Sequence, residues 1–343
     1  MNINISGAHI FSRTGSHIPG LFMMSSSPDS VTRTSQETSR EFYFEGLSCG
    51  REGRHEDALA LFARALDADP RLALAWVGRG FALGKLGRYE EEITCCDRAI
   101  ALDPRCIDAW NNKAFALGLL GRFEEKAVCC EKALEIDPEN AAAWNNKGVA
   151  LGMLGRYESE IHCCDRALAL RPKYLSAWVN RGFACGKLKR YEDEIASYDR
   201  ALKIYPRYLT ALMRKGRVLI LQKQYRDAAE VLRQALEIEP AHARTLYLRG
   251  LALSSAGQHD EAIPLLEKSL KMDASNADAW VVLSNSCFLS GKLEESARAF
   301  DQAYYIDVKD VRTGIVKGMS YLKTGKFDDA IHAFSDVLGI LLR

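Results

Sequence analysis

The chain has 343 residues, with 46 Lys and Arg against 45 Asp and Glu and a formal net charge of +1. This balance gives no basis for bulk attraction to nucleic acid or to an anionic membrane surface. No run of about 18 apolar residues occurs, which excludes a transmembrane helix by length. The ten cysteines suit a reducing cytosol better than a secreted disulfide scaffold. We therefore expect a cytoplasmic protein without nucleic-acid or membrane partners.

The first segment, residues 1–38, is rich in Ser and Thr and has no acidic residue before Asp29. Its apolar stretch, residues 18–24, is too short for a signal peptide and lacks a basic segment in front of it. We expect a disordered leader. Initiation at Met23 or Met24 and an organelle-type transit peptide are the alternatives.

From residue 39 onward the sequence repeats with a period of 34 residues. A fixed period between about 20 and 50 residues indicates a repeat architecture. Prolines recur at Pro70, Pro104, Pro138, Pro172, Pro206 and Pro240, and tryptophans at Trp76, Trp110, Trp144, Trp178 and Trp280. The repeats are 39–72, 73–106, 107–140, 141–174, 175–208, 209–242, 243–276, 277–310 and 311–343.

Each repeat reads as a helix, a turn and a second helix. In repeat 141–174, Trp144 and Gly148 lie on one helical face, and Gly155 interrupts the pattern. A second periodic segment follows and ends before Pro172, which cannot continue a helix. Neither helix can bury its apolar stripe without a neighbouring repeat.

These positions resemble the tetratricopeptide repeat, with Trp at position four, a small residue at position eight, Ala at position 27 and Pro at position 32. The segment AWNNKGVALGMLGRYE is similar to segments of multi-repeat proteins of archaea and bacteria. The resemblance implies an all-α fold, a right-handed α-solenoid of about nine 34-residue helix–turn–helix repeats over 39–343. It also implies a protein–protein interaction module or scaffold.

Three Cys-Cys pairs occupy positions 23 and 24 of repeats two to four, as Cys95-Cys96, Cys129-Cys130 and Cys163-Cys164. Other repeats carry large apolar residues at position 24, so we interpret the pairs as core residues and not as metal ligands. No catalytic motif was found, and the carboxylates recur in register as a scaffold places them. We expect no enzymatic activity, no cofactor and no metal.

In the related superhelices, positions two, five, six, nine and twelve of the first helix line a concave groove. An amide side chain can both donate to and accept from a peptide unit, whatever the sequence of the peptide. We therefore predict that the groove binds an extended peptide segment of a protein partner. The predicted peptide-binding residues are Asn112, Asn146, Asn180, Asn111, Asn145, Phe81, Phe115 and Phe183. The alternative is that these asparagines are tolerated polar residues in duplicated repeats.

The alternative function is an assembly scaffold that docks or weakly self-associates through an uncapped C-terminal repeat, 311–343. Its apolar stripe would be Phe327, Ile331, Phe334 and Leu338.

Two further positions of the repeat carry unusual residues. Position 20 is charged in repeats two to five, at Glu92, Lys126, Glu160 and Glu194. Glu92, Lys126 and Glu160 alternate in sign, and we expect them to form a charge ladder with the position-seven residues Arg79, Lys147 and Arg181, with the charged ends paired, since an unpaired buried charge is costly. Position twelve is glycine in repeats one to five, and the sequence does not decide whether these glycines end a helix or open the groove.

Overall fold

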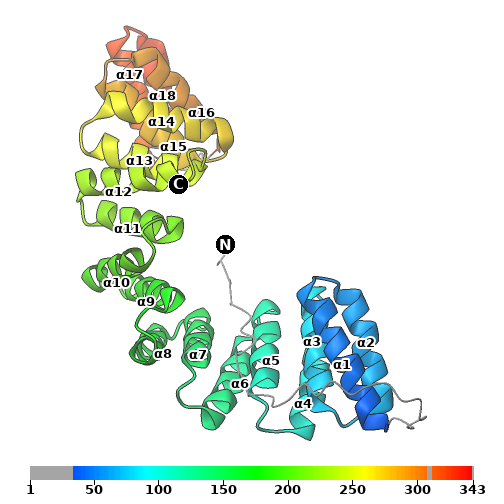
Figure 1. Cartoon of the computed structure of the whole chain (residues 1–343). Coiled ribbons are helices and arrows are strands. Elements are labelled where there is room, and N and C mark those ends of the chain that lie inside the picture. Colours follow the sequence, from blue (N-terminus) through cyan, green and yellow to red (C-terminus); the bar gives the residue numbers. More distant parts are fainter. Residues whose placement is uncertain (1–33, 307–310, 342–343) are drawn as a thin grey trace. The chain divides into compact units, whose positions relative to one another are not determined.

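The computed structural model describes residues 34–306 and 311–341, and every regular element within these ranges is an α-helix. Figure 1 shows the helices following one another in antiparallel pairs. The prediction of an all-α array of helix–turn–helix repeats is confirmed. The chain divides into two compact units, Met1–Leu170 and Arg171–Arg343, which are described separately.

The first unit contains four repeats. Its helices are α1 (Ser35–Arg51), α2 (His55–Ala68), α3 (Ala73–Lys85), α4 (Tyr89–Leu102), α5 (Ile107–Leu119), α6 (Phe123–Ile136), α7 (Ala141–Met153) and α8 (Tyr157–Leu170). Helix α1 begins four residues ahead of the first predicted repeat and is capped by Thr34 through a capping box with Glu37. The remainder of the predicted leader, residues 1–33, lies outside the described residues.

The second unit contains the other repeats. Its helices are α9 (Leu175–Lys187), α10 (Tyr191–Ile204), α11 (Leu209–Leu221), α12 (Tyr225–Ile238), α13 (Ala243–Ser255), α14 (His259–Met272), α15 (Ala277–Leu289), α16 (Leu293–Ile306), α17 (Val311–Lys323) and α18 (Phe327–Leu341).

Within each unit, every helix packs on the next one along the chain, and first helices of successive repeats also touch one another. In the first unit α1 contacts α3, α3 contacts α5 and α5 contacts α7. In the second unit the same holds for α11, α13, α15 and α17. The first helices therefore form a layer of their own, and we call the surface of this layer that carries the half-buried positions six and nine the first-helix face.

The tryptophan and proline columns are connected by a hydrogen bond. The indole Nε1 of Trp144 donates to the carbonyl oxygen of Pro138 in the preceding repeat, at 2.9 Å. Trp76, Trp110 and Trp178 make the same bond to the proline six residues earlier. The bond satisfies a carbonyl beyond the end of the second helix and fixes where the next repeat begins.

The cysteine pairs lie in the core, as predicted. Cys96, Cys130 and Cys164 are fully buried, and Cys95, Cys129 and Cys163 are 4, 3 and 2% exposed. The small residue at position eight faces them: a Cβ placed on Gly148 would lie 3.1 Å from Cys163 Cβ and 3.3 Å from the backbone oxygen of Glu160. The two helices of repeat four therefore leave little room for a side chain at this position, and repeat three carries only alanine, Ala114, there.

Replacing Gly148 with leucine should overpack this crossing and destabilise the first unit by about 1–3 kcal/mol. Contacts in a repeat array are mostly between neighbours, so the loss should stay local. Hydrogen exchange is expected to accelerate in α5 to α8 and to remain unchanged in α13 to α16. Equal acceleration in both groups of helices would contradict this nearest-neighbour description.

Candidate functional site

The predicted site residues of the first unit lie on α3, α5 and α7, which contact one another in that order. Phe81, Phe115, Asn112 and Asn146 are all half-buried, so each presents part of its side chain on the first-helix face. Asn112 and Asn146 occupy the same position on neighbouring helices. The structure thus brings two equivalent amides and two aromatic rings onto one surface.

The two asparagines at position five lie deeper than the groove prediction requires. Asn145 is only 5% exposed. Asn111 is half-buried, and its amide oxygen Oδ1 is buried without a hydrogen-bond partner among the described residues. Asn145 therefore faces the neighbouring helices, whereas Asn146 beside it at position six is half-buried.

In the second unit, Asn180 and Phe183 lie half-buried on α9. The guanidinium of Arg214 on α11 lies 4.9 Å from the ring centroid of Phe183, and the amine of Lys187 lies 5.3 Å from it. Two cations near one ring form cation–π contacts. Phe183 is therefore a partly covered platform with positive charge around it, and sequence reasoning missed both basic residues.

A second set of residues lies directly beneath the first-helix face. The charged side chains at position 20 of repeats two to five, Glu92, Lys126, Glu160 and Glu194, are at most 4% exposed. Each of them occupies the space that a side chain at position twelve of its own repeat would fill. A Cβ on Gly84, Gly152 or Gly186 would overlap the carboxylate of Glu92, Glu160 or Glu194, and one on Gly118 would lie 3.0 Å from Lys126 Nζ. The glycines at position twelve of these repeats therefore accommodate buried charged side chains.

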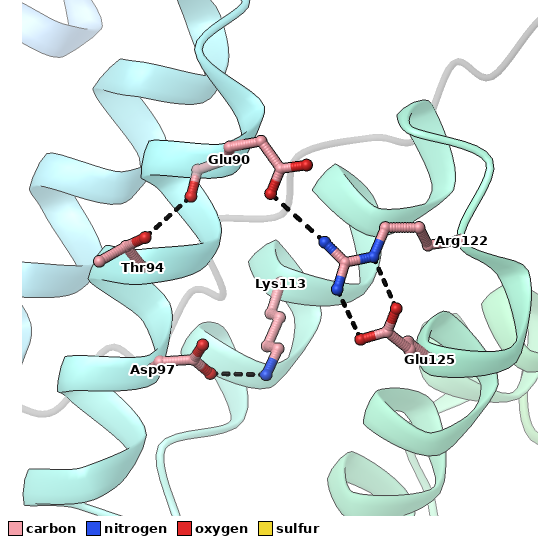
Figure 2. A network of polar contacts seen from close by, with 6 residues as sticks. All are labelled: Glu90, Thr94, Asp97, Lys113, Arg122 and Glu125. Atoms are coloured by element: carbon pink, nitrogen blue, oxygen red, sulfur yellow. Dashed lines mark hydrogen bonds and ion pairs between the residues drawn. The ribbon is translucent and has the colours of Figure 1, made fainter.

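The predicted pairing of position 20 with position seven is wrong. Lys147 pairs instead with Glu131, at 3.0 Å, and Lys113 pairs with Asp97, at 2.5 Å. Figure 2 shows that Lys113 reaches from α5 to Asp97 on α4. Position seven faces the second helix of the preceding repeat, at position 25, whereas position 20 points toward position twelve of its own repeat.

Burial shifts the pKa of these groups toward their neutral forms. Desolvation raises the pKa of both Glu92 and Glu160 to about 8 and lowers the pKa of Lys126. Oε2 of Glu92 and of Glu160 has no hydrogen-bond partner among the described residues. At neutral pH the folded first unit therefore holds both carboxyls largely protonated.

Glu194 in the second unit is better compensated. Its Oε1 accepts a hydrogen bond from the Tyr198 hydroxyl at 3.2 Å and lies 3.6 Å from Nη2 of Arg217. Desolvation still raises its pKa, while Arg217 and Tyr198 act in the opposite direction.

The last repeat carries the apolar stripe that was predicted to mediate self-association. Phe327 and Ile331 on α18 are 64 and 62% exposed, and Phe334 is half-buried against Gly318. Self-association through repeat 311–343 stays a prediction, and the side chain of Leu338 lies outside the described residues. Within residues 34–306 and 311–341, no helix is long and apolar enough to span a bilayer, and no cluster of three potential metal ligands occurs.

Models of the tetratricopeptide repeat match most of the chain. The matched residues are 45–105 and 247–310, then 208–275, 129–162, 107–140 and 175–208. The chain belongs to the tetratricopeptide repeat family. None of the curated proteins matches the sequence.

Solved structures agree with the fold. YrrB, described as a tetratricopeptide repeat protein with an unusual peptide-binding site, is 21% identical with a TM-score of 0.51, over 55% of this chain and 96% of its own. The pilF protein of Pseudomonas aeruginosa is 19% identical with a TM-score of 0.55, over 62 and 97% of the two chains. A tetratricopeptide repeat protein of Parabacteroides merdae is 15% identical with a TM-score of 0.55, over 73 and 99%.

Proposed function

We propose that the first helices of repeats two to four, α3, α5 and α7 of the first unit, bind an extended segment of a partner protein, and that α9 of the second unit offers a like amide at Asn180. The observation that carries this proposal is the equivalent, half-buried placement of Asn112 and Asn146 on the contacting helices α5 and α7. Neighbouring helices about 10 Å apart match about three residues of extended chain. One amide per repeat can therefore hold every third peptide group. Asn180 occupies the same repeat position on α9 of the second unit.

The aromatic residues add apolar contact beside the amides. Phe81 on α3 and Phe115 on α5 are half-buried like Asn112, and Lys85 Nζ lies 5.2 Å from the ring centroid of Phe81. Cations beside Phe81 and Phe183 favour a segment with acidic or amide side chains over a basic one. Membership of the tetratricopeptide repeat family supports a role in protein–protein interaction.

The triple replacement of Asn112, Asn146 and Asn180 by alanine should weaken partner binding by about one to three decades. Each lost hydrogen bond contributes about 0.5–1.5 kcal/mol. The partner is first captured with the immobilised full chain, and its dissociation constant is then measured by calorimetry. Helical content and melting temperature should stay unchanged, and Asn285→Ala in repeat eight serves as the matched control.

A photo-crosslinking residue locates the contact independently of affinity. Placed at Phe115 on the first-helix face, it should capture the partner. Placed at Val128, which is 53% exposed on the second helix α6, it should not. A partner that crosslinks only from Val128, or that binds the triple variant as tightly as the parent, would overturn the proposal.

A further inference from the structure

Ion pairs connect successive repeats on the side of the second helices. A lysine at position seven reaches an acid at position 25 of the preceding repeat. The pairs are Lys113–Asp97, Lys147–Glu131, Lys215–Asp199 and Lys317–Asp301, with N–O distances of 2.5, 3.0, 2.6 and 2.7 Å. We call the junction between two successive repeats a step. In Figure 2 the first of these pairs lies beside Arg122, which contacts Glu90 of repeat two and Glu125 of repeat three, on either side of the same step.

Repeat eight breaks this pattern. The preceding repeat keeps an acid at position 25, Glu267, but position seven of repeat eight is Leu283. Wherever else an acid occupies position 25, the next repeat supplies a lysine or arginine at position seven. Glu267 therefore lacks the cation that the same step has elsewhere.

A cavity of about 690 Å³ lies at this step, among α14, α15 and α16 of the second unit. Its walls are apolar and buried: Leu270, Leu283, Cys287 and Ala299 are 2 to 5% exposed. The exposed carboxylates of Glu267 and Glu295 lie on its lining. The site thus combines an apolar interior with two acids at its edge.

The charges around the cavity leave a negative excess at that edge. Arg298 already pairs with Glu294, and Asp301 pairs with Lys317. Lys271 is the remaining basic residue of the lining. Burial raises the pKa of the Cys287 thiol to about 11, and Glu295 and Glu267 contribute in the same direction, so both carboxylates act on the cavity interior.

The equivalent step between repeats five and six shows how a cation occupies this position. There a cavity of about 610 Å³ is lined by both Lys215 and Asp199, whose amine and carboxylate pair at 2.6 Å. Leu219 also lines this cavity and corresponds in position to Cys287 of repeat eight. A long aliphatic stem ending in a cation therefore suits the geometry of these steps.

We propose that the cavity between repeats seven and eight is a docking site for a partner protein, which inserts a lysine or arginine side chain flanked by an apolar residue. The stem contacts Leu283, and the cation takes the place of the missing position-seven lysine beside Glu267 and Glu295. The flanking apolar residue covers Leu270 and Ala299. This surface is separate from the first-helix face and does not depend on the function proposed for it.

The test uses the full chain and a capped pentapeptide, Ala-Leu-Lys-Leu-Ala, with a matched peptide carrying norleucine in place of lysine. Binding is followed by nuclear magnetic resonance through the indole N–H of Trp280, which lines the cavity. The lysine peptide should give a saturable shift and should bind more tightly than its norleucine counterpart. Absence of a shift at millimolar peptide, or equal binding of both peptides, would overturn the proposal.

Three variants test the position of the cation. Leu283→Lys should fill the site from within, keep or raise the melting temperature, and weaken peptide binding about tenfold or more. Glu267→Gln, on an exposed side chain, should weaken binding by about threefold while leaving the fold intact. Lys215→Leu should free Asp199 and create a second binding site between repeats five and six. Unchanged peptide affinity in Leu283→Lys, with helical content preserved, would contradict the assigned location.

Discussion

Replacing Gly152 with isoleucine is expected to destabilise the first unit by about 2–4 kcal/mol. The new side chain would occupy the space of the buried Glu160 carboxyl, so the cost combines overpacking with displacement of a buried polar group. Urea denaturation of the full chain, followed by hydrogen exchange of α7 and α8, measures both the size of the loss and its location.

Glu160→Ala should rescue this variant, because repeat six already combines Ile220 at position twelve with Ala228 at position 20. The double variant should recover most of the lost stability, and coupling between contacting residues is typically about 0.5–3 kcal/mol. Gly50→Ile is the matched control: no atom lies within 4 Å of a Cβ at Gly50, and Ala58 is already small. If Gly152→Ile and Gly50→Ile cost the same, the glycine is not making room for the carboxyl.

The repeat architecture could be predicted from the sequence because, with a period of 34 residues, each position of the repeat can be compared across all repeats. We call the set of residues at one such position a column. A residue such as Cys130 is ambiguous alone, yet its column contains Phe62 and Leu232, which indicates a core position. The carbonyl of Pro138 that Trp144 binds could not be predicted, because proline was interpreted only as a helix terminator. Backbone acceptors leave no trace in a residue pattern.

The packing beneath the first-helix face was missed for a different reason. Gly152 and Glu160 are each unusual for their positions in the repeat, and the sequence shows both. However, Gly152 lies on α7, before the turn of the repeat, and Glu160 lies on α8, after it. Relating them requires the direction of each side chain across a helical hairpin. The pairing predicted for position seven was wrong for the same reason, because side-chain directions were not considered. Lys147 pairs with Glu131 of the preceding repeat and not with Glu160 of its own repeat. The sequence did contain a signal for this packing. Repeat four combines glycine at position twelve with glutamate at position 20, whereas repeat six combines isoleucine at position twelve with alanine at position 20.

The stability of the first unit should fall as the pH rises from about 5 to about 9. Glu92 and Glu160 have a pKa of about 8 in the folded chain, against an ordinary value of 4.5 for a glutamate side chain. Below the unfolded pKa both states bind the proton and no penalty exists. Between the two values the unfolded chain releases protons that the folded chain retains, so folding becomes less favourable until the folded carboxyls also ionise.

Glu92→Gln and Glu160→Gln should each remove about half of this pH dependence, because each variant replaces one of the two carboxyls with an amide that cannot ionise. At about pH 9 each variant should be more stable than the parent by up to roughly 3–5 kcal/mol, whereas at about pH 5 the three proteins should unfold at similar urea concentrations. Glu91→Gln is the control, since Arg88 lowers the pKa of that exposed carboxyl and its removal should leave the alkaline loss in place. Should both glutamine variants keep the parent's alkaline destabilisation, the buried carboxyls would have to be ionised and solvated in the folded chain, and the glycines at position twelve would be admitting water to them.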